Sequence, residues 1–196
     1  MIVISNPIPV KSEMQIIHSL FEEGLLLFHI RKPDFSEEEM KLFLSEIGLE
    51  FRSRLILHSQ HQLASTFGIN RIHFTEKERT NPFRISNPER VKSTSTHIIE
   101  DFNTLESEFD YAFLSPIYPS ISKQHYTSNV NHLEEIEKRT NFSTKLIALG
   151  GISRENIKKT LEKGFEDVAL LGSIWNTKNP IENFKLCQQV AHSHSL

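Results

Sequence analysis

The chain alternates short apolar runs with segments in which apolar residues recur every three or four positions. Consecutive apolar residues are typical of a parallel strand buried on both faces, and the longer spacing is typical of an amphipathic helix. The pattern predicts eight strands, at 2–5, 25–30, 54–58, 70–74, 91–95, 110–114, 145–149 and 167–171. We expect helical segments between them.

Serines and glycines mark the expected ends of the helices. Ser12 and Ser153 are candidate N-caps, and Ser36, followed by three glutamates, predicts a capping box. The expected helix stops are glycines, each followed by an apolar residue: Gly24, Gly48, Gly68 and Gly164. Segment 75–90 holds two prolines and little periodicity, so we expect a loop there with at most one helical turn.

Regular alternation of strands and helices predicts an α/β fold, a (β/α)₈ barrel of the TIM type, as one domain over residues 1–196. An open, doubly wound parallel sheet is the alternative, because the number of repeats is compatible with both.

Composition excludes several classes of protein. A net charge of −3 with interspersed charges argues against a general nucleic-acid binder and a basic membrane-binding patch. One cysteine, Cys187, excludes an internal disulfide framework and a cysteine-based zinc site. The chain has no basic leader and no apolar stretch of membrane-spanning length. We therefore expect a cytoplasmic protein with neither nucleic acid nor membrane as a partner.

The expected strand ends are rich in cations, hydroxyls and histidines. In a barrel these ends form the functional face, and this chemistry suits a phosphorylated ligand. Gly150-Gly151 and Gly172 end two consecutive apolar strands, which suggests that backbone amides hold a phosphate. A plain tight turn is the alternative for the glycine pair. Arg31 could equally be solvated or paired, and His73 could be a hydrogen-bonded core histidine.

Evidence for a metal site is limited to two acids. The chain contains no HExxH motif, which argues against a histidine-based metalloenzyme site. Glu76 and Glu78 could bind Mg²⁺ together with a pyrophosphate, because that ion often needs few carboxylates once substrate oxygens are present. They could equally be surface charges.

Five blocks of the chain resemble the thiamine phosphate synthases and the related thiazole tautomerases. The most specific are STSTHIIEDF, DYAFLSPIYPSISK and LIALGGISRENIKKTLEKGFEDVALLGSIW, which resemble the family's GVSTHSLEEA, DYVGLGPIFPTxTK and VVAIGGI…N…GADGVAVVSAI. LLLFHIRKPDFSEEEM and LILHSQHQLASTFGINRIHF resemble its QLREK and NDR blocks. The resemblance implies a barrel that joins hydroxymethylpyrimidine diphosphate to thiazole phosphate and releases pyrophosphate.

The resemblance also implies roles for individual residues. Arg31 matches the arginine that grips the diphosphate, and Ser95 and Lys123 match groups that stabilise departing pyrophosphate. Further substrate-binding candidates lie at the other strand ends: His29, His58, His97, Ser120, Ser122, Gly150, Gly151, Gly172 and Ser173.

The chain departs from the family mainly in the diphosphate half. The family's NDR asparagine and aspartate fall at His58 and Ser59, so one Mg²⁺ carboxylate is replaced. The other falls at Glu78, our candidate metal ligand, while the QLREK glutamine and lysine become His29 and Pro33.

These departures keep two alternatives open. A thiazole tautomerase would need a proton-transferring histidine; the usual position holds Pro116, and His29, His58 or His97 could replace it. A non-catalytic barrel that binds a phosphorylated ligand is the second alternative. The expected partners are phosphorylated thiazole and pyrimidine substrates, and the oligomeric state, with a homodimer as one option, stays open.

Overall fold

Eight parallel strands form a closed barrel in the computed structural model, which describes residues 1–79, 90–105, 107–119 and 131–194. Each strand pairs with its neighbour in the sequence, and β8 returns to pair with β1. The strands are β1 (Ile2–Ile4), β2 (Leu27–Ile30), β3 (Leu55–Leu57), β4 (Arg71–Phe74), β5 (Val91–Thr96), β6 (Tyr111–Leu114), β7 (Lys145–Leu149) and β8 (Asp167–Leu170). The expected (β/α)₈ barrel is confirmed, and closure by β1 and β8 excludes the open sheet.

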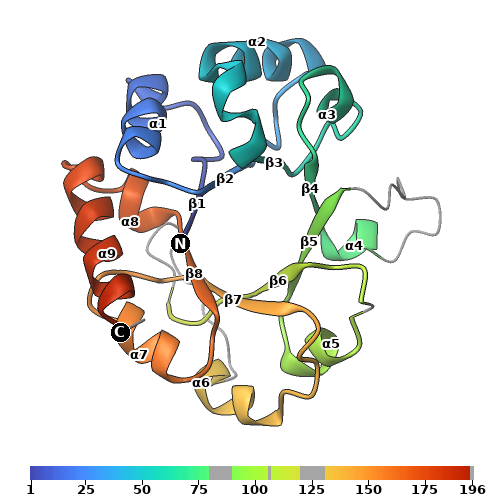
Figure 1. Ribbon diagram of the computed structural model, residues 1–196, viewed down its shortest axis with the longest axis vertical. Helices are drawn as coiled ribbons and strands as arrows, with labels where there is room; N and C mark the ends of the chain where they lie inside the picture. The colour runs from blue at the N-terminus through green and yellow to red at the C-terminus, as the bar shows by residue number, and fades with distance from the viewer. Residues whose placement is uncertain (80–89, 106, 120–130, 195–196) are drawn as a thin grey trace.

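Helices surround the barrel (Figure 1). The α-helices are α1 (Glu13–Glu22), α2 (Glu37–Ile47), α3 (Leu63–Thr66), α4 (Glu76–Arg79), α5 (Ile99–Asn103), α6 (His132–Glu135), α7 (Ile157–Glu162), α8 (Gly172–Trp175) and α9 (Pro180–His194). Single 3₁₀ segments cover Leu49–Arg54 and Ile136–Lys138. The long α9 packs against α1, α7 and α8. After β4 the described chain holds one helical turn, as expected.

Helix ends follow the sequence signals only in part. Ser36 and Glu39 form the expected capping box. Ser12 does not cap through its side chain, because its backbone is left-handed at φ 59°. The helix expected to open at Ser153 begins at Ile157, because a turn closed on the Ser153 carbonyl comes first. The expected stop glycines all have a positive φ: Gly24, Gly48, Gly68 and Gly164.

The barrel interior is apolar on one side and polar on the other. Alternate strand residues face inward, and the rest pack against the helices. The inward apolar cluster comes from β1, β6, β7 and β8: Ile2, Ile4, Tyr111, Phe113, Ile147 and Ala169. On β2 and β4 the outward neighbours Phe28, Ile30, Ile72 and Phe74 belong to the outer core, so His29 and His73 face inward. This places imidazoles inside the barrel.

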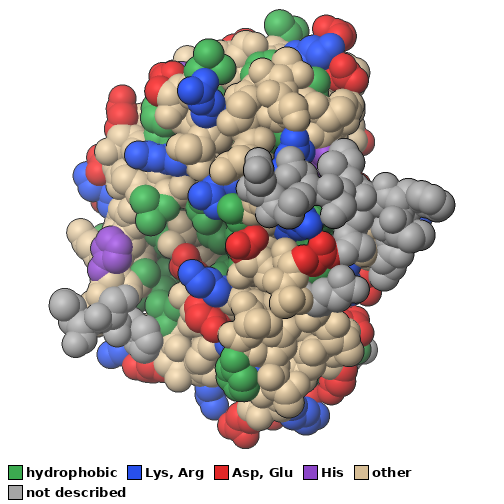
Figure 2. All heavy atoms as spheres, turned by 45° about the vertical axis from the view of Figure 1, so that its right-hand side comes forward, with side chains coloured by type: hydrophobic (Ala, Val, Ile, Leu, Met, Phe, Trp, Pro, Cys, Tyr) green, Lys and Arg blue, Asp and Glu red, His purple; other side chains and the backbone are tan. Residues whose placement is uncertain are grey.

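Charged side chains of both signs are mixed on the face of the molecule that Figure 2 presents, where Lys and Arg are interspersed with Asp and Glu. The described helices include none that combines the length and apolar character needed to cross a membrane.

Candidate functional site

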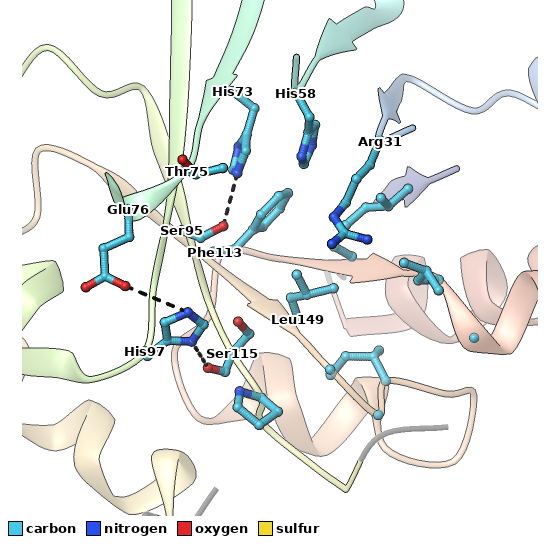
Figure 3. A pocket seen from close by; sticks show the side chains of 18 of the residues that line it. Arg31, His58, His73, Thr75, Glu76, Ser95, His97, Phe113, Ser115 and Leu149 are labelled. Atoms are coloured by element: carbon cyan, nitrogen blue, oxygen red, sulfur yellow. Dashed lines mark hydrogen bonds and ion pairs between the residues drawn. The ribbon is translucent and has the colours of Figure 1, made fainter. Parts of the chain in front are cut away.

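A cavity of about 510 Å³ opens among the carboxyl ends of the strands. Seven of the residues predicted from the sequence line it: Arg31, His58, Ser95, His97, Gly150, Gly151 and Gly172. Predicted Lys123, Ser120 and Ser122 lie outside the described residues. Predicted His29 and Ser173 are buried next to the wall, and Glu78 lines an adjoining cavity. Figure 3 shows several of these side chains pointing into one space.

Three histidines from β2, β4 and the end of β3 cluster at the cavity floor, which His58 and His73 line. His29 Nδ1 lies 2.8 Å from His58 Nε2, and the rings of His58 and His73 stack at 4.0 Å between centroids. His29 and His73 are buried, whereas His58 is half-buried and reaches the cavity. We call these three residues the histidine side.

Hydroxyl groups hold the remaining nitrogens of two of these rings. Tyr111 Oη lies 2.8 Å from His29 Nε2. Ser93 Oγ lies 2.9 Å from His73 Nδ1, and Ser95 Oγ lies 3.0 Å from His73 Nε2. Tyr111 was missed by sequence reasoning. The alternation of Tyr111 with Phe113 along one strand was the signal that could have placed Tyr111 inside the barrel.

Burial keeps the histidine side uncharged. It lowers the pKa of His29 and His58 well below the usual 6.5, and electrostatic interaction with the neighbouring His73 adds to the effect. Burial also lowers the pKa of His73 to about 3. It raises the pKa of Tyr111 to about 12, so this phenol keeps its proton. The floor of the cavity is therefore a neutral network at physiological pH.

Arg31 projects into the cavity from the end of β2 (Figure 3). Its backbone is held by Ser5: the Arg31 amide donates to Ser5 Oγ at 2.8 Å, and that hydroxyl donates to the Arg31 carbonyl at 3.2 Å. Over the described part of the chain, no carboxylate forms an ion pair with its guanidinium. The cavity thus contains a cation available to an anionic ligand.

Lys32, the next residue, points away from the cavity into the outer core. Its ammonium donates to both Glu13 oxygens, at 2.6 and 2.8 Å, and lies 5.0 Å from the Phe43 ring centroid. Both partners are buried. Burial lowers the pKa of Lys32, while Glu13 opposes that shift. Lys32 therefore joins the loop after β2 to α1, and it also contributes to the lining of the adjoining cavity that contains Glu78.

Backbone forms another wall, which we call the glycine side: Gly150, Gly151 and Gly172. The Gly150 carbonyl accepts from the Tyr118 amide at 3.0 Å, in the loop after β6. A Cβ at Gly150 would lie 2.8 Å from Pro116 Cα, and one at Gly151 would lie 2.4 Å from the Pro119 carbonyl oxygen. Both glycines also have a positive φ, of 97° and 65°. Close packing of the loop after β6 is thus sufficient to favour glycine at positions 150 and 151, whether or not a phosphate binds there.

Ser173 follows Gly172 at the end of β8. Within the described residues its buried Oγ has no hydrogen-bond partner. Its carbonyl accepts from Asn183 Nδ2 at 2.6 Å, which joins this turn to α9. A buried hydroxyl without a partner is uncommon, because desolvation costs free energy that a hydrogen bond normally offsets.

His97 and Glu76 face each other at the cavity mouth. His97 Nδ1 donates to the Ser115 carbonyl at 2.8 Å, and His97 Nε2 lies 4.0 Å from Glu76 Oε2 (Figure 3). Both side chains are about half exposed. The donated hydrogen bond places the proton of a neutral His97 on Nδ1 and leaves Nε2 as a proton acceptor.

Ser59 and Glu78 line the adjoining cavity together with Arg31, Lys77 and His58. Glu78 Oε2 accepts from the Thr75 amide at 2.8 Å and from Thr75 Oγ1 at 2.7 Å, so it caps the short helix α4. Ser59 and Glu78, the two positions where the family resemblance places Mg²⁺ ligands, therefore line one cavity. Its carboxylate, Glu78, already accepts two hydrogen bonds through Oε2, and Arg31 and Lys77 belong to the same lining.

Comparison with known proteins identifies the family of this chain. A family model described as thiamine monophosphate synthase matches residues 1–174. A thiamine-phosphate synthase of Bacillus cereus (strain AH187) is 24% identical over 197 residues, covering 93% of this chain and 88% of that protein. A Bacteroides thetaiotaomicron structure named thiamine phosphate pyrophosphorylase superposes with a TM-score of 0.79 at 29% identity, over 98% and 97% of the two chains. A Pyrococcus furiosus structure of that name, at 15% identity over 98% and 95% of the chains, has a TM-score of 0.79 and shows the fold.

Proposed function

The chain belongs to the thiamine monophosphate synthase family, and from this membership we propose that it joins hydroxymethylpyrimidine diphosphate to thiazole phosphate in thiamine biosynthesis. The observation that carries the proposal is Arg31, whose guanidinium enters the strand-end cavity that the glycine side also lines. A cation and backbone amides in one cavity suit two phosphorylated substrates bound side by side.

In the proposed reaction the bond between the pyrimidine methylene carbon and the diphosphate oxygen breaks, and the thiazole nitrogen bonds to that carbon. Negative charge grows on the departing diphosphate, so a cation held there lowers the barrier. We assign this role to Arg31 and Lys123, with the Ser95 hydroxyl as a hydrogen-bond donor.

The thiazole phosphate is assigned to the glycine side. Gly151 and Gly172 would supply backbone amides, and the buried Ser173 hydroxyl would supply the hydrogen bond that it lacks among the described residues. Ser120 and Ser122 are proposed to bind substrate through their hydroxyl groups.

Magnesium is proposed to bind only together with the diphosphate. Glu78 offers a carboxylate whose Oε2 is engaged by Thr75, and Ser59 offers a hydroxyl in the same cavity. This donor set fits Mg²⁺ once substrate oxygens complete the shell, because the ion commonly uses one or two carboxylates plus phosphate oxygens. When bound, the ion would neutralise diphosphate charge.

Product formation from the two substrates with Mg²⁺, followed by chromatography, tests the proposal. Replacing Arg31 with Gln should lower kcat/KM by about 10²–10³-fold, as expected for loss of a group that stabilises developing charge. Arg154→Gln is the matched control, because Arg154 is half exposed beside Glu155. Lys123→Ala should also abolish product. Absence of thiamine phosphate at every Mg²⁺ concentration contradicts the proposal.

A thiazole tautomerase is the second candidate, and His97 favours it. Its ring is held on the carbonyl of Ser115, beside Pro116 where the tautomerase histidine is expected, and its Nε2, which faces Glu76, would accept the proton. Proton exchange on a carboxythiazole phosphate, lost in His97→Gln, would support this reaction. Stabilisation by thiazole phosphate without either turnover would instead support a binding protein. The homodimer and the cytoplasmic location remain predictions; light scattering tests the homodimer.

A further inference from the structure

The histidine side has a geometry that the synthase reaction does not use. His29 lies in β2, His58 directly follows β3 and His73 lies in β4, so three neighbouring strands supply them. One ligand nitrogen of each lies within 4.8 Å of the others. Arg31 also lies beside these rings and lowers the pKa of His58 and His73. We propose that these three imidazoles bind a transition-metal ion such as Zn²⁺ or Co²⁺ at the floor of the cavity.

The donor set selects the class of metal. Neutral imidazole nitrogens suit Zn²⁺, Co²⁺, Ni²⁺ and Cu²⁺, whereas Mg²⁺ takes oxygen ligands. The site therefore differs in chemistry from the proposed Mg²⁺ position at Glu78 in the adjoining cavity, although His58 lines both cavities. Three histidines with a fourth position left open is a common arrangement for zinc.

Outer hydrogen bonds orient two of the rings for this role. Tyr111 Oη holds His29 Nε2, which leaves Nδ1 directed at His58. Ser93 Oγ holds His73 Nδ1, which leaves Nε2 for the metal. Metal-binding histidines usually have the second nitrogen fixed in this way by an oxygen partner, which sets the ring orientation.

Binding requires only local movement of the rings. Zinc–nitrogen bonds of about 2.0–2.1 Å in a tetrahedron place ligand nitrogens about 3.3 Å apart. The 2.8 Å hydrogen bond between His29 and His58 would therefore open slightly, while the wider separations close. The metal replaces this hydrogen bond and the one from Ser95 to His73 Nε2.

The fourth coordination position would face the cavity, because His58 and His73 line it together with Arg31 and Phe113. A water molecule or an anionic oxygen of a ligand beside Arg31 could occupy it. A bound transition metal would thus change the floor of the pocket without any change of the backbone.

Calorimetry with Zn²⁺ and visible spectroscopy with Co²⁺ test the site on the full chain, prepared without a histidine tag and treated with a chelator. We expect one equivalent of Zn²⁺ to bind and Co²⁺ to show the intense absorption of a four-coordinate ion. Excess Mg²⁺ should not displace either ion. Failure of equimolar Zn²⁺ to bind, or its displacement by Mg²⁺, overturns the proposal.

Two variants and a control test whether the three histidines bind the Zn²⁺ ion. His58→Gln should weaken Zn²⁺ binding at least 100-fold, and its half-buried position makes it the variant expected to fold. Tyr111→Phe keeps every ligand but removes an outer hydrogen bond, so we expect a loss of about tenfold. His192→Gln, an exposed histidine on α9, should leave binding unchanged. Equal affinity in His58→Gln and the parent chain overturns the proposal.

Discussion

The two walls of the cavity differ in whether side chains or backbone form them. The histidine side consists of side chains in a hydrogen-bonded network, carried by ordinary strand backbone. The glycine side consists of backbone pressed against the loop after β6, with no room for a side chain at Gly150 or Gly151. A substitution on the histidine side can thus change its chemistry without moving the backbone. A substitution at Gly150 or Gly151 would instead displace the loop after β6. The departures from the family pattern noted above, at His29, His58 and Ser59, lie on or next to the first wall.

Lowering the pH should reduce the free energy of unfolding through the three buried histidines, and this is the largest effect we expect. His29, His58 and His73 have pKa values far below the unfolded value of 6.5, that of His73 being about 3. The unfolded chain therefore binds more protons below pH 6.5, and stability is lost as the pH falls from there toward 3. Between about pH 7.5 and 5.5 the three groups together should cost about 4 kcal/mol.

Urea unfolding of the chelator-treated chain at these two pH values measures the effect. This window lies above the usual carboxylate pKa values, so the histidines dominate it. His73→Gln should reduce the loss by about a third. Equal stability of the parent chain at both pH values would show that the rings are not buried as neutral groups.

On the glycine side, Gly150→Ala should cost about 3 kcal/mol, since it combines backbone strain with contact against Pro116. Gly164→Ala is the matched control: its φ of 102° is close to the 97° of Gly150, but its Cβ would meet nothing nearer than 3.7 Å. We expect about 1 kcal/mol there. Chemical denaturation measures the loss of stability in both variants. Equal losses would show that contact with the loop after β6 does not contribute to the loss at Gly150.

Tyr111→Phe should cost about 1–2 kcal/mol, because a buried nitrogen of His29 loses its partner. Tyr118→Phe provides the comparison. Its hydroxyl bonds Thr160 Oγ1 at 3.0 Å, and Thr160 keeps a second bond to the Asn156 carbonyl. We expect about 0.5 kcal/mol for that variant. Thermal unfolding of both proteins would show whether the histidine network depends on Tyr111.

Ser173→Ala should have the smallest effect on stability, within about 0.5 kcal/mol, because the hydroxyl has no partner among the described residues to lose. Binding of thiazole phosphate should nevertheless weaken by about tenfold, if this hydroxyl supplies one hydrogen bond to the phosphate. Calorimetry on the variant separates the two effects. A large loss of stability with unchanged affinity would assign Ser173 to the fold alone.

The sequence predicted the barrel well because each strand is signalled locally. The expected strand 145–149 matches β7, and the other seven differ by at most two residues at either end. The capping box at Ser36 is likewise local. The prediction for Ser12 was wrong because its cap depends on the entering backbone, whose conformation the residue type does not determine.

The histidine network could not be predicted in the same way. His29, His58 and His73 are far apart in the sequence and meet only when three strands are aligned in register. Single histidines at strand ends could be identified, but their mutual hydrogen bonds and the contribution of Tyr111 require the closed barrel. The glycine pair was easier to identify, although its contact with Pro116 and Pro119 was not expected.

The buried ion pair of Lys32 with Glu13 bears on the entropy of ligand binding. It fixes the residue next to Arg31 against α1, and Ser5 fixes the Arg31 backbone itself. The conformational entropy of ordering this segment is therefore lost during folding and not when an anion arrives. An incoming diphosphate would have to restrict only the Arg31 side chain, so more of its interaction energy would remain as affinity.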